Sequence, residues 1–198
     1  MNKIYTIGHS THASDAFVRL LSIHCITAVC DVRSSPYSKF NPQFNRETIR
    51  RELKRHGISY VFLGKELGPR SDDPACYENG KVQYSKLAET DIFSKGIDRL
   101  KNGMKSYHIA LMCSEKDPIT CHRMILICRH LRSHDIEIQH ILEDGRLENN
   151  RDSEKRLMEM LKIPPADLFD SEEDLIQRAY DKQSERIAYI IKETEPHE

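Results

Sequence analysis

The chain has no tryptophan, and its apolar runs are only a few residues long. A membrane-spanning helix needs about 20 consecutive apolar residues, so we expect no membrane segment and no membrane partner. The N-terminus enters a strand-like pattern directly, without the apolar core of a signal peptide. These absences favour a cytoplasmic protein.

No two cysteines have the Cys-x-x-Cys spacing of a zinc or redox motif, and no export signal accompanies the six cysteines. Reduced thiols are therefore expected. The interval between Cys113 and Cys121 matches no standard zinc spacing, so we expect no metal ion and no other cofactor, although ten histidines leave a metal possible. A Walker loop, a GxGxxG motif and a serine-hydrolase elbow are also absent.

The 198 residues suit one globular domain with an extension, because 38% are hydrophobic and 31% are charged. The net charge of −1 hides an asymmetry: residues 1–142 carry +6 and residues 143–198 carry −7. A basic body suits an anionic small molecule, a nucleotide or a nucleic acid as partner. Solvated helix faces would give the same asymmetry.

Strand-like and helix-like segments alternate along the first three quarters of the chain. The expected strands are 3–10, 25–33, 59–64, 107–114 and 136–142, and the expected helices are 14–24, 45–56, 84–102 and 120–134. This alternation predicts an α/β fold with a mostly parallel five-stranded sheet covered by helices. The irregular stretch between Lys65 and Gln83 reads as a long surface loop.

The C-terminal quarter differs in composition. We expect an α/β domain over residues 1–148 and an acidic helical extension over residues 149–198. The Ser-Glu-Glu-Asp stretch 171–174 resembles a capping box that opens a long amphipathic helix reaching Ile190 and Ile191. This helix would pack on the outside of the domain or form a homodimer.

Polar residues gather where the predicted strands end, which is where open α/β sheets bind ligands. We expect catalytic residues among Glu115, Asp31, Cys121 and His9. We expect substrate contacts from Ser10, Arg33, Ser35, Ser38, Lys39, His122 and Arg123. Simpler interpretations stay open: Asp31 and Arg33 would pair with each other, and Cys113 and Cys121 would be small core residues.

The segment ALMCSEKDPITCHR (110–123) is unusually rich in reactive side chains for a strand-to-helix connection. Pro118 fits the first helical position with Asp117 as its cap, which would place Cys121, His122 and Arg123 in the first or second helical turn. The helix dipole there would attract an anion and lower the pKa of an accessible cysteine.

Residues 34–45 mix hydroxyls, aromatic rings and Lys39, and a strongly basic helix follows them. Aromatic rings can stack on bases, and nearby cations can bind phosphates. This combination suits a nucleotide or a single-stranded nucleic acid. A solvated helix face would also account for the basic residues.

Four ordered motifs resemble a known family: TIGHS (6–10), DVRSSPYS (31–38), GISYVFLGKELG (57–68) and ALMCSEKDPITCHR (110–123). Together they are similar to the family catalogued as domain of unknown function 488, over roughly residues 3–145. The matching positions are Gly8, His9, Ser10, Asp31, Arg33, Pro36, Ser38, Leu67, Gly68, Cys113, Glu115, Cys121, His122 and Arg123. Pro69 departs from the glycine expected there. The resemblance supports the map of the site more than any activity.

Three functions are compatible with these residues. The leading hypothesis is a hydrolase or transferase that acts on a phosphate-bearing nucleotide or nucleic acid, with glycosidic-bond chemistry carried by carboxylates. The first alternative is thiol-dependent sulfur transfer or redox chemistry, although the segment after Cys113 lacks the glycine-assisted anion loop of rhodaneses. The second is a non-catalytic module that binds a nucleotide or nucleic acid.

Overall fold

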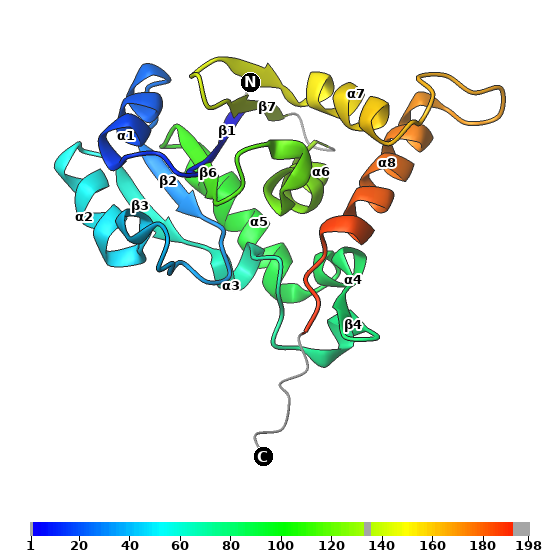
Figure 1. Cartoon of the computed structure of the whole chain (residues 1–198), viewed down its shortest axis with the longest axis horizontal. Coiled ribbons are helices and arrows are strands. Elements are labelled where there is room, and N and C mark those ends of the chain that lie inside the picture. Colours follow the sequence, from blue (N-terminus) through cyan, green and yellow to red (C-terminus); the bar gives the residue numbers. More distant parts are fainter. Residues whose placement is uncertain (1, 133–135, 192–198) are drawn as a thin grey trace.

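The computed structural model describes residues 2–132 and 136–191. Its main sheet has six strands in the order β3-β2-β6-β1-β7-β8 (Figure 1). These strands are β1 (Asn2–Gly8), β2 (Ala28–Asp31), β3 (Ser59–Phe62), β6 (Ile109–Cys113), β7 (Ile136–Ile141) and β8 (Leu147–Asn149). Five strands pair in parallel, which confirms the mostly parallel α/β fold. The antiparallel edge strand β8 was not predicted.

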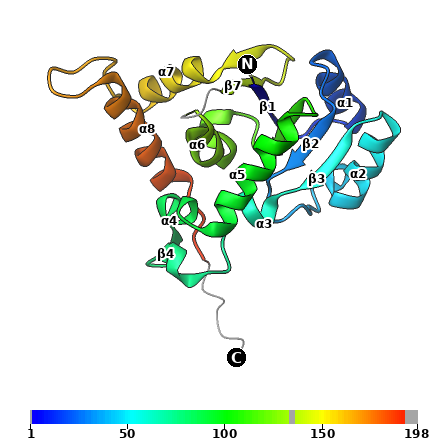
Figure 2. The same cartoon turned by 180° about the vertical axis from the view of Figure 1, so that it is seen from behind.

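Helices cover both faces of the sheet (Figures 1 and 2). They are α1 (Ser14–Ile23), α2 (Arg46–Arg55), α3 (Gly64–Leu67), α4 (Tyr84–Ala88), α5 (Asp91–Met104), α6 (Arg129–Leu131), α7 (Asn150–Met160) and α8 (Glu172–Ile187). Phe17 of α1 and Ile49 of α2 share one apolar cluster with Val29 of the sheet. The opposite cluster joins Leu100 of α5 and Leu131 of α6 to the sheet. The buried sheet faces explain the near-continuous apolar runs of β2 and β6.

Two predicted helices are interrupted in the structure. The helix expected at 84–102 is divided into α4 and α5, because the Thr90 side chain accepts a hydrogen bond from the Phe93 amide and caps a new helix. The helix expected at 120–134 begins instead with a 3-10 turn, Pro118–Thr120, capped by Asp117 as predicted. An extended residue, a π-helical turn (Arg123–Cys128) and α6 follow, and residues 133 and 134 lie outside the described residues.

The predicted surface loop between Lys65 and Gln83 contains ordered elements. Helix α3 is followed by a 3-10 turn, Pro74–Cys76, and by a hairpin of β4 (Tyr77–Glu78) and β5 (Lys81–Val82). Asn79 and Gly80 form the hairpin turn, and both have positive φ. The Asn-Gly dipeptide favours this turn type, so the sequence did carry a signal for the hairpin.

The C-terminal segment packs on the α/β core. The capping box is confirmed, since the Ser171 hydroxyl and the Asp174 carboxylate each accept a hydrogen bond from the other residue's amide. Leu175 and Tyr180 of α8 are fully buried in the cluster that also contains strand residues. The helix ends at Ile187, and Ile190 instead pairs with Lys81 of the hairpin. The division into residues 1–148 and 149–198 stays a prediction.

The order of the strands determines where a ligand crevice can form. The connections after β1 and β2 run through α1 and α2 on one face, whereas the connection after β6 runs through α6 on the other face. Strand β6 lies between β1 and β2 in the sheet. Chains that leave neighbouring strands toward opposite faces open a crevice at the carboxyl end of the sheet. A ligand crevice is therefore expected at the carboxyl end of β6.

Among the described residues, no helix combines the length and the apolar character needed to cross a lipid bilayer.

Candidate functional site

Arg33 follows β2 and is held by a dense network of acceptors. Its guanidinium forms a two-point pair with Asp31, with Nε at 2.9 Å from Oδ1 and Nη2 at 2.7 Å from Oδ2. Nη2 also donates to the carbonyl of Phe44 at 2.8 Å, and Nη1 lies 3.1 Å from Nε2 of His9. These contacts within the described residues use four of the five N–H groups, which leaves one for a ligand.

His9 and Asp31 both serve to orient Arg33. The Nδ1 atom of His9 lies 2.9 Å from the carbonyl of Ser10, so this nitrogen carries the proton and Nε2 accepts from Arg33. Burial and the charge of Arg33 lower the pKa of His9 to about 4, which keeps the ring neutral. Asp31 is completely buried and also accepts from the Tyr60 hydroxyl. This geometry favours the orienting role for Asp31 and His9 over direct catalysis.

A second group of side chains lies at the end of β6. Its members are Cys113, Glu115, Cys121 and His122, whose ligand atoms all lie within 4.8 Å of one another. Glu115 Oε2 is 2.8 Å from the Cys113 sulfur and 3.2 Å from the Cys121 sulfur. His122 Nδ1 is 3.6 Å and 3.9 Å from the same two sulfurs. Two thiols, one imidazole and one carboxylate thus share one small space.

The backbone around Cys121 explains how these groups meet. The 3-10 turn ends at Thr120, and Cys121 is extended, so it precedes the next helix instead of lying in a first or second turn. The Cys121 carbonyl accepts from the amides of Met124 and Ile125 and starts that helix. The expected helical placement of Cys121 is therefore wrong. The extended residue directs its thiol toward Glu115.

The two thiols have different proton affinities. Burial raises the pKa of Cys113 well above its usual value, and the neighbouring Cys121 raises it further. Burial acts on Cys121 in the same direction, but the hydrogen bond from Cys113 and the charge of Arg123 hold its pKa well below the usual value. Burial and Cys121 also raise the pKa of Glu115. The cluster therefore favours one thiolate at Cys121.

Arg123 fixes the loop after β6 and is not among the residues that line the small pocket described below. Its guanidinium is fully buried and donates to the carbonyls of Glu115 and Lys116 at 2.7 and 3.0 Å. Its Nε donates to the Thr6 hydroxyl of β1. The predicted anion contact by Arg123 is thus replaced by a role in fixing the 115–116 backbone. Gly8 permits this fixed loop, because a Cβ there would lie 2.0 Å from the Glu115 carbonyl oxygen.

A pocket of about 130 Å³ joins the two groups of residues. It is lined by Arg33, Ser34, Ser35, Pro69, Arg70, Cys113, Ser114, Glu115 and His122. The Ser34 hydroxyl is buried and has no hydrogen-bond partner among the described residues. Buried polar groups are normally satisfied, so an orphaned hydroxyl beside two arginines suits an anionic ligand.

The other predicted ligand contacts lie around the pocket and not in its wall. The Ser38 hydroxyl accepts from the amides of Phe40 and Asn41 and shapes a turn, and Lys39 is exposed. Ser10 has positive φ and extends the β1–β6 pairing through the carbonyl of Ser114. A further set of wall residues was not predicted as ligand contacts: Ser34, Pro69, Arg70 and Ser114. Arg70 directly follows Pro69, which departs from the glycine expected there. This departure was the only feature of the sequence that pointed to Arg70.

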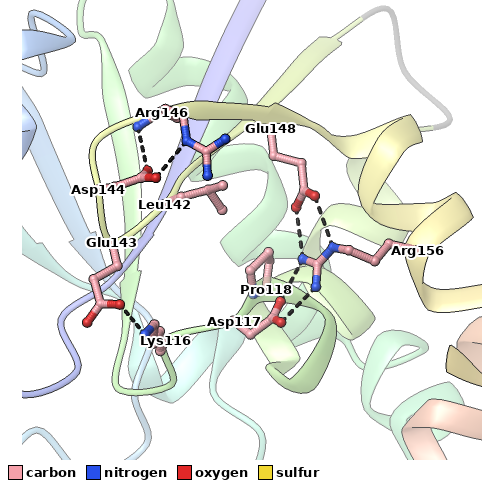
Figure 3. A pocket seen from close by; sticks show the side chains of 9 residues that line it. All are labelled: Lys116, Asp117, Pro118, Leu142, Glu143, Asp144, Arg146, Glu148 and Arg156. Carbon is pink, nitrogen blue, oxygen red and sulfur yellow. Dashed lines mark hydrogen bonds and ion pairs between the residues drawn. The ribbon is translucent and has the colours of Figure 1, made fainter.

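A larger cavity of about 470 Å³ is lined by Lys116, Asp117 and Pro118 and by side chains between Leu142 and Arg156 (Figure 3). Its charged side chains neutralise one another: Arg156 pairs with Asp117 and Glu148, and Lys116 pairs with Glu143. The cavity contains no thiol or imidazole. The smaller pocket, which has reactive groups and an unsatisfied hydroxyl, is therefore the candidate site.

A sequence profile of the family described as domain of unknown function DUF488 matches residues 13–129, more than half of the chain. The chain belongs to this family. The resemblance noted in the sequence is thereby confirmed. The matched region of this DUF488 protein includes Arg33, Cys113, Glu115, Cys121 and His122, whereas His9 precedes it and helices α7 and α8 follow it. Neither a curated protein nor a solved structure matches the chain.

The DUF488 motif Leu67–Gly68 has a packing role at the pocket. A Cβ at Gly68 would lie 2.3 Å from the Ser34 hydroxyl and 2.2 Å from the Gly64 carbonyl oxygen. Glycine at 68 therefore lets the loop that carries Pro69 and Arg70 close against the residues after β2.

Proposed function

We propose that this DUF488 protein is an enzyme that acts on a phosphate-bearing nucleotide or nucleic acid, with hydrolysis or transfer at a glycosidic bond as its reaction. The observation that carries this proposal is the pocket in which Arg33 and Arg70 stand beside Glu115 and His122. Arginine binds phosphate through paired N–H donors, and the carboxylate supplies acid–base chemistry at neutral pH.

The size of the pocket supports recognition of one part of a larger substrate. Liquid water occupies about 30 Å³ per molecule, so about 130 Å³ accommodates a group of roughly phosphate size and not a whole nucleotide. The remainder of the substrate would lie outside. Ser35 in the wall is followed by Tyr37 and by Phe40, which is 94% exposed. Such a ring suits stacking on a base.

Glu115 is the carboxylate available for the reaction. Asp31 already accepts hydrogen bonds from Arg33 and Tyr60 and has no exposed surface. Burial raises the pKa of Glu115 above its usual value, which favours the protonated carboxyl that a general acid needs. An oxocarbenium-like transition state would be stabilised by the carboxylate beside it.

The test is a screen of nucleotides and 5′-phosphorylated oligonucleotides, with release of the free base measured by chromatography. We expect Glu115→Gln to lower turnover at least 100-fold, because general acid–base catalysis contributes roughly that much. We expect Arg70→Ala to raise KM about 10-fold for phosphorylated substrates and little for the matching nucleosides, since a charged hydrogen bond contributes about 1.5 kcal/mol.

Arg178→Ala is the matched control for Arg70→Ala. Arg178 is also exposed, but it pairs with Asp170 near the start of α8. We expect its replacement to leave both kinetic constants unchanged. The proposed reaction is contradicted if no substrate of the panel releases its base, or if Glu115→Gln keeps the activity of the natural chain.

Phe40 provides a separate test of nucleic-acid binding. A base stacked on an aromatic ring contributes about 1 to 3 kcal/mol, so Phe40→Ala should weaken binding of a single-stranded oligonucleotide at least 5-fold. Phe169→Ala is the matched control, because Phe169 is also 94% exposed but lies in the loop before α8. Fluorescence anisotropy at fixed salt measures both. Equal affinities of the two variants would exclude stacking on Phe40.

Thiol chemistry is the second candidate function, and the lowered pKa of Cys121 favours it. In that case Cys113, which lines the pocket, would be the sulfur closest to the substrate. A cytoplasmic location and a homodimer through α8 also remain proposals. The apolar side chains Leu175 and Tyr180 of α8 pack on the core of the same chain, so a dimer would have to use other residues.

A further inference from the structure

We propose that Cys113, Glu115, Cys121 and His122 bind one divalent zinc ion. Their four donor atoms are two sulfurs, one nitrogen and one oxygen, all within 4.8 Å of one another. Zinc is bound by cysteine, histidine and carboxylate ligands in a four-coordinate tetrahedral arrangement. This proposal concerns metal binding and goes beyond the proposed reaction.

The sulfur-to-nitrogen distances agree with a tetrahedron around zinc. With Zn–S near 2.3 Å and Zn–N near 2.05 Å, a tetrahedral site separates sulfur from nitrogen by about 3.5 Å. The two sulfurs of the site lie 3.6 and 3.9 Å from His122 Nδ1. The sulfur-to-oxygen separation in such a site is about 3.6 Å. The distances of 2.8 and 3.2 Å from Glu115 Oε2 are shorter than this, because the carboxylate accepts hydrogen bonds directly from the two thiols. Zinc binding therefore requires the Glu115 side chain to move outward from the sulfurs.

The orientation of His122 is that of a metal ligand. Its Nε2 atom lies 3.0 Å from the carbonyl oxygen of Val32, which can only accept a hydrogen bond. Nε2 therefore carries the proton, and the lone pair of Nδ1 faces the thiols. A metal-bound histidine typically donates its other N–H to a carbonyl or carboxylate in this way, which fixes the ring and its tautomer.

Metal binding would displace the protons of the cluster, and a divalent cation would then balance its charges. Cys113, Glu115 and Cys121 together carry three negative charges when all are ionised. Arg123 is buried beside them, and its guanidinium donates to backbone carbonyls and to Thr6, not to a carboxylate among the described residues. The backbone amide of Arg123 donates to the Cys121 sulfur. The guanidinium supplies one positive charge, so a divalent ion would make the group neutral. Uncompensated buried charge is otherwise costly.

The donor types select among metals. Thiolates are soft ligands that favour zinc over magnesium, calcium or manganese, which prefer oxygen. Cys113, Glu115 and His122 also line the small pocket, so the ion would face it. Glu115 is the exposed residue of the four and is the ligand that water or substrate from the pocket would displace. The spacing of Cys113 and Cys121 in the sequence predicted no metal site, because it matches no zinc loop. In the fold, the end of a strand supplies one thiol and an extended residue supplies the other.

The test uses the full-length protein, reduced and stripped with a chelator. Cobalt(II) is titrated as the probe, and we expect thiolate-to-cobalt absorption that saturates at one equivalent and disappears when zinc is added. Cys113→Ser, Cys121→Ser and His122→Ala should weaken binding by more than the 10- to 100-fold typical of losing an outer hydrogen-bond partner. Cys25→Ser and Cys76→Ser are the controls, since these thiols lie outside the cluster.

X-ray absorption on the zinc-loaded natural chain gives an answer that does not depend on the folding of any variant. We expect two sulfur neighbours at about 2.3 Å and two nitrogen or oxygen neighbours at about 2.0 to 2.2 Å. The proposal is overturned by the absence of stoichiometric binding, by a shell without two sulfurs, or by cobalt absorption that persists in Cys113→Ser and Cys121→Ser. None of these experiments measures catalytic activity. A negative result for metal binding is therefore distinct from a negative result for the proposed reaction.

Discussion

Replacing Asp31 by leucine is expected to lower the free energy of unfolding by about 3 to 5 kcal/mol, because it leaves the buried charge of Arg33 without its partner. The pair is almost fully buried, with side-chain exposures of 0% for Asp31 and 5% for Arg33. The change also removes the acceptor of the Tyr60 hydroxyl. Urea unfolding followed by circular dichroism measures the effect.

Replacing both Asp31 and Arg33 separates two contributions to the free energy of unfolding: the cost of leaving one buried charge unpaired, and the net stabilisation by the ion pair. Arg33→Met alone should cost a similar amount, since it leaves a buried carboxylate. Asp31→Leu combined with Arg33→Met should cost less than the sum of the two single changes, because neither charge remains. Asp15→Asn is the control, as the Asp15–Arg19 pair is exposed and should contribute at most about 1 kcal/mol. Additive effects of the two single changes would contradict this account.

The same pair explains a division of roles at the pocket. A guanidinium that is fixed by Asp31, His9 and Phe44 loses little conformational freedom when it binds an anion. Arg70 is exposed, and its guanidinium stacks on the ring of Tyr189 at 3.9 Å. The pocket thus combines one rigid arginine with one at its surface. Tyr189 belongs to the C-terminal segment beyond the matched DUF488 region, so this segment contributes to the second arginine's position.

The sequence predicted the parts of the fold that depend on buried, regular segments. Strands β2 and β6 were predicted because both of their faces are covered, which produces near-continuous apolar runs. Strands β1, β3 and β7 are less buried and were predicted from shorter or interrupted apolar patterns. The caps at Asp117 and Ser171 were predicted because they depend on side chains next to their helices. Strand β8 was missed because it has only three residues at an exposed edge, without a distinctive apolar pattern.

The sequence predicted several residues of the candidate site but not how their side chains are arranged. Strand ends indicated Arg33, Glu115 and His122, which the pocket does bring together. The orientation of Arg123 depends on its contacts with Thr6 and with the 115–116 carbonyls, which come from distant parts of the chain. A proline can indicate where a helical turn starts, but the extended conformation of Cys121 is set by tertiary packing. For this reason the meeting of the two thiols could not be foreseen.

A continuous buried network connects the site to the C-terminal helices. Thr6, which accepts from Arg123, lies 2.8 Å from Nδ1 of His140, and Nε2 of His140 lies 3.1 Å from the Asn150 side-chain oxygen. Asn150 in turn donates to Glu154, which also accepts from Tyr180 of α8. Helices α7 and α8 are thereby tied to the residue that fixes the 115–116 backbone.

This network should make the stability of the protein depend on pH between about 6.5 and 4. Burial and the charge of Arg123 lower the pKa of His140 to about 4, against 6.5 for an exposed histidine. The unfolded chain therefore binds a proton at a higher pH than the folded chain does. The contribution of His140 is complete above pH 6.5, decreases as the pH falls, and is lost by about pH 4.

His140→Asn isolates this contribution from those of other groups. Lowering the pH from 7.5 to 5 should cost the natural chain about 2 kcal/mol through His140 alone, and the variant should not show this loss. His9, whose pKa is also about 4, acts in the same direction in both proteins, whereas burial raises the pKa of Glu154 and acts in the opposite direction. These terms cancel in the comparison. Urea unfolding at several pH values measures the free energy of unfolding of both proteins, and the two curves should converge as the pH falls. Parallel curves would mean that His140 does not resist protonation in the folded chain.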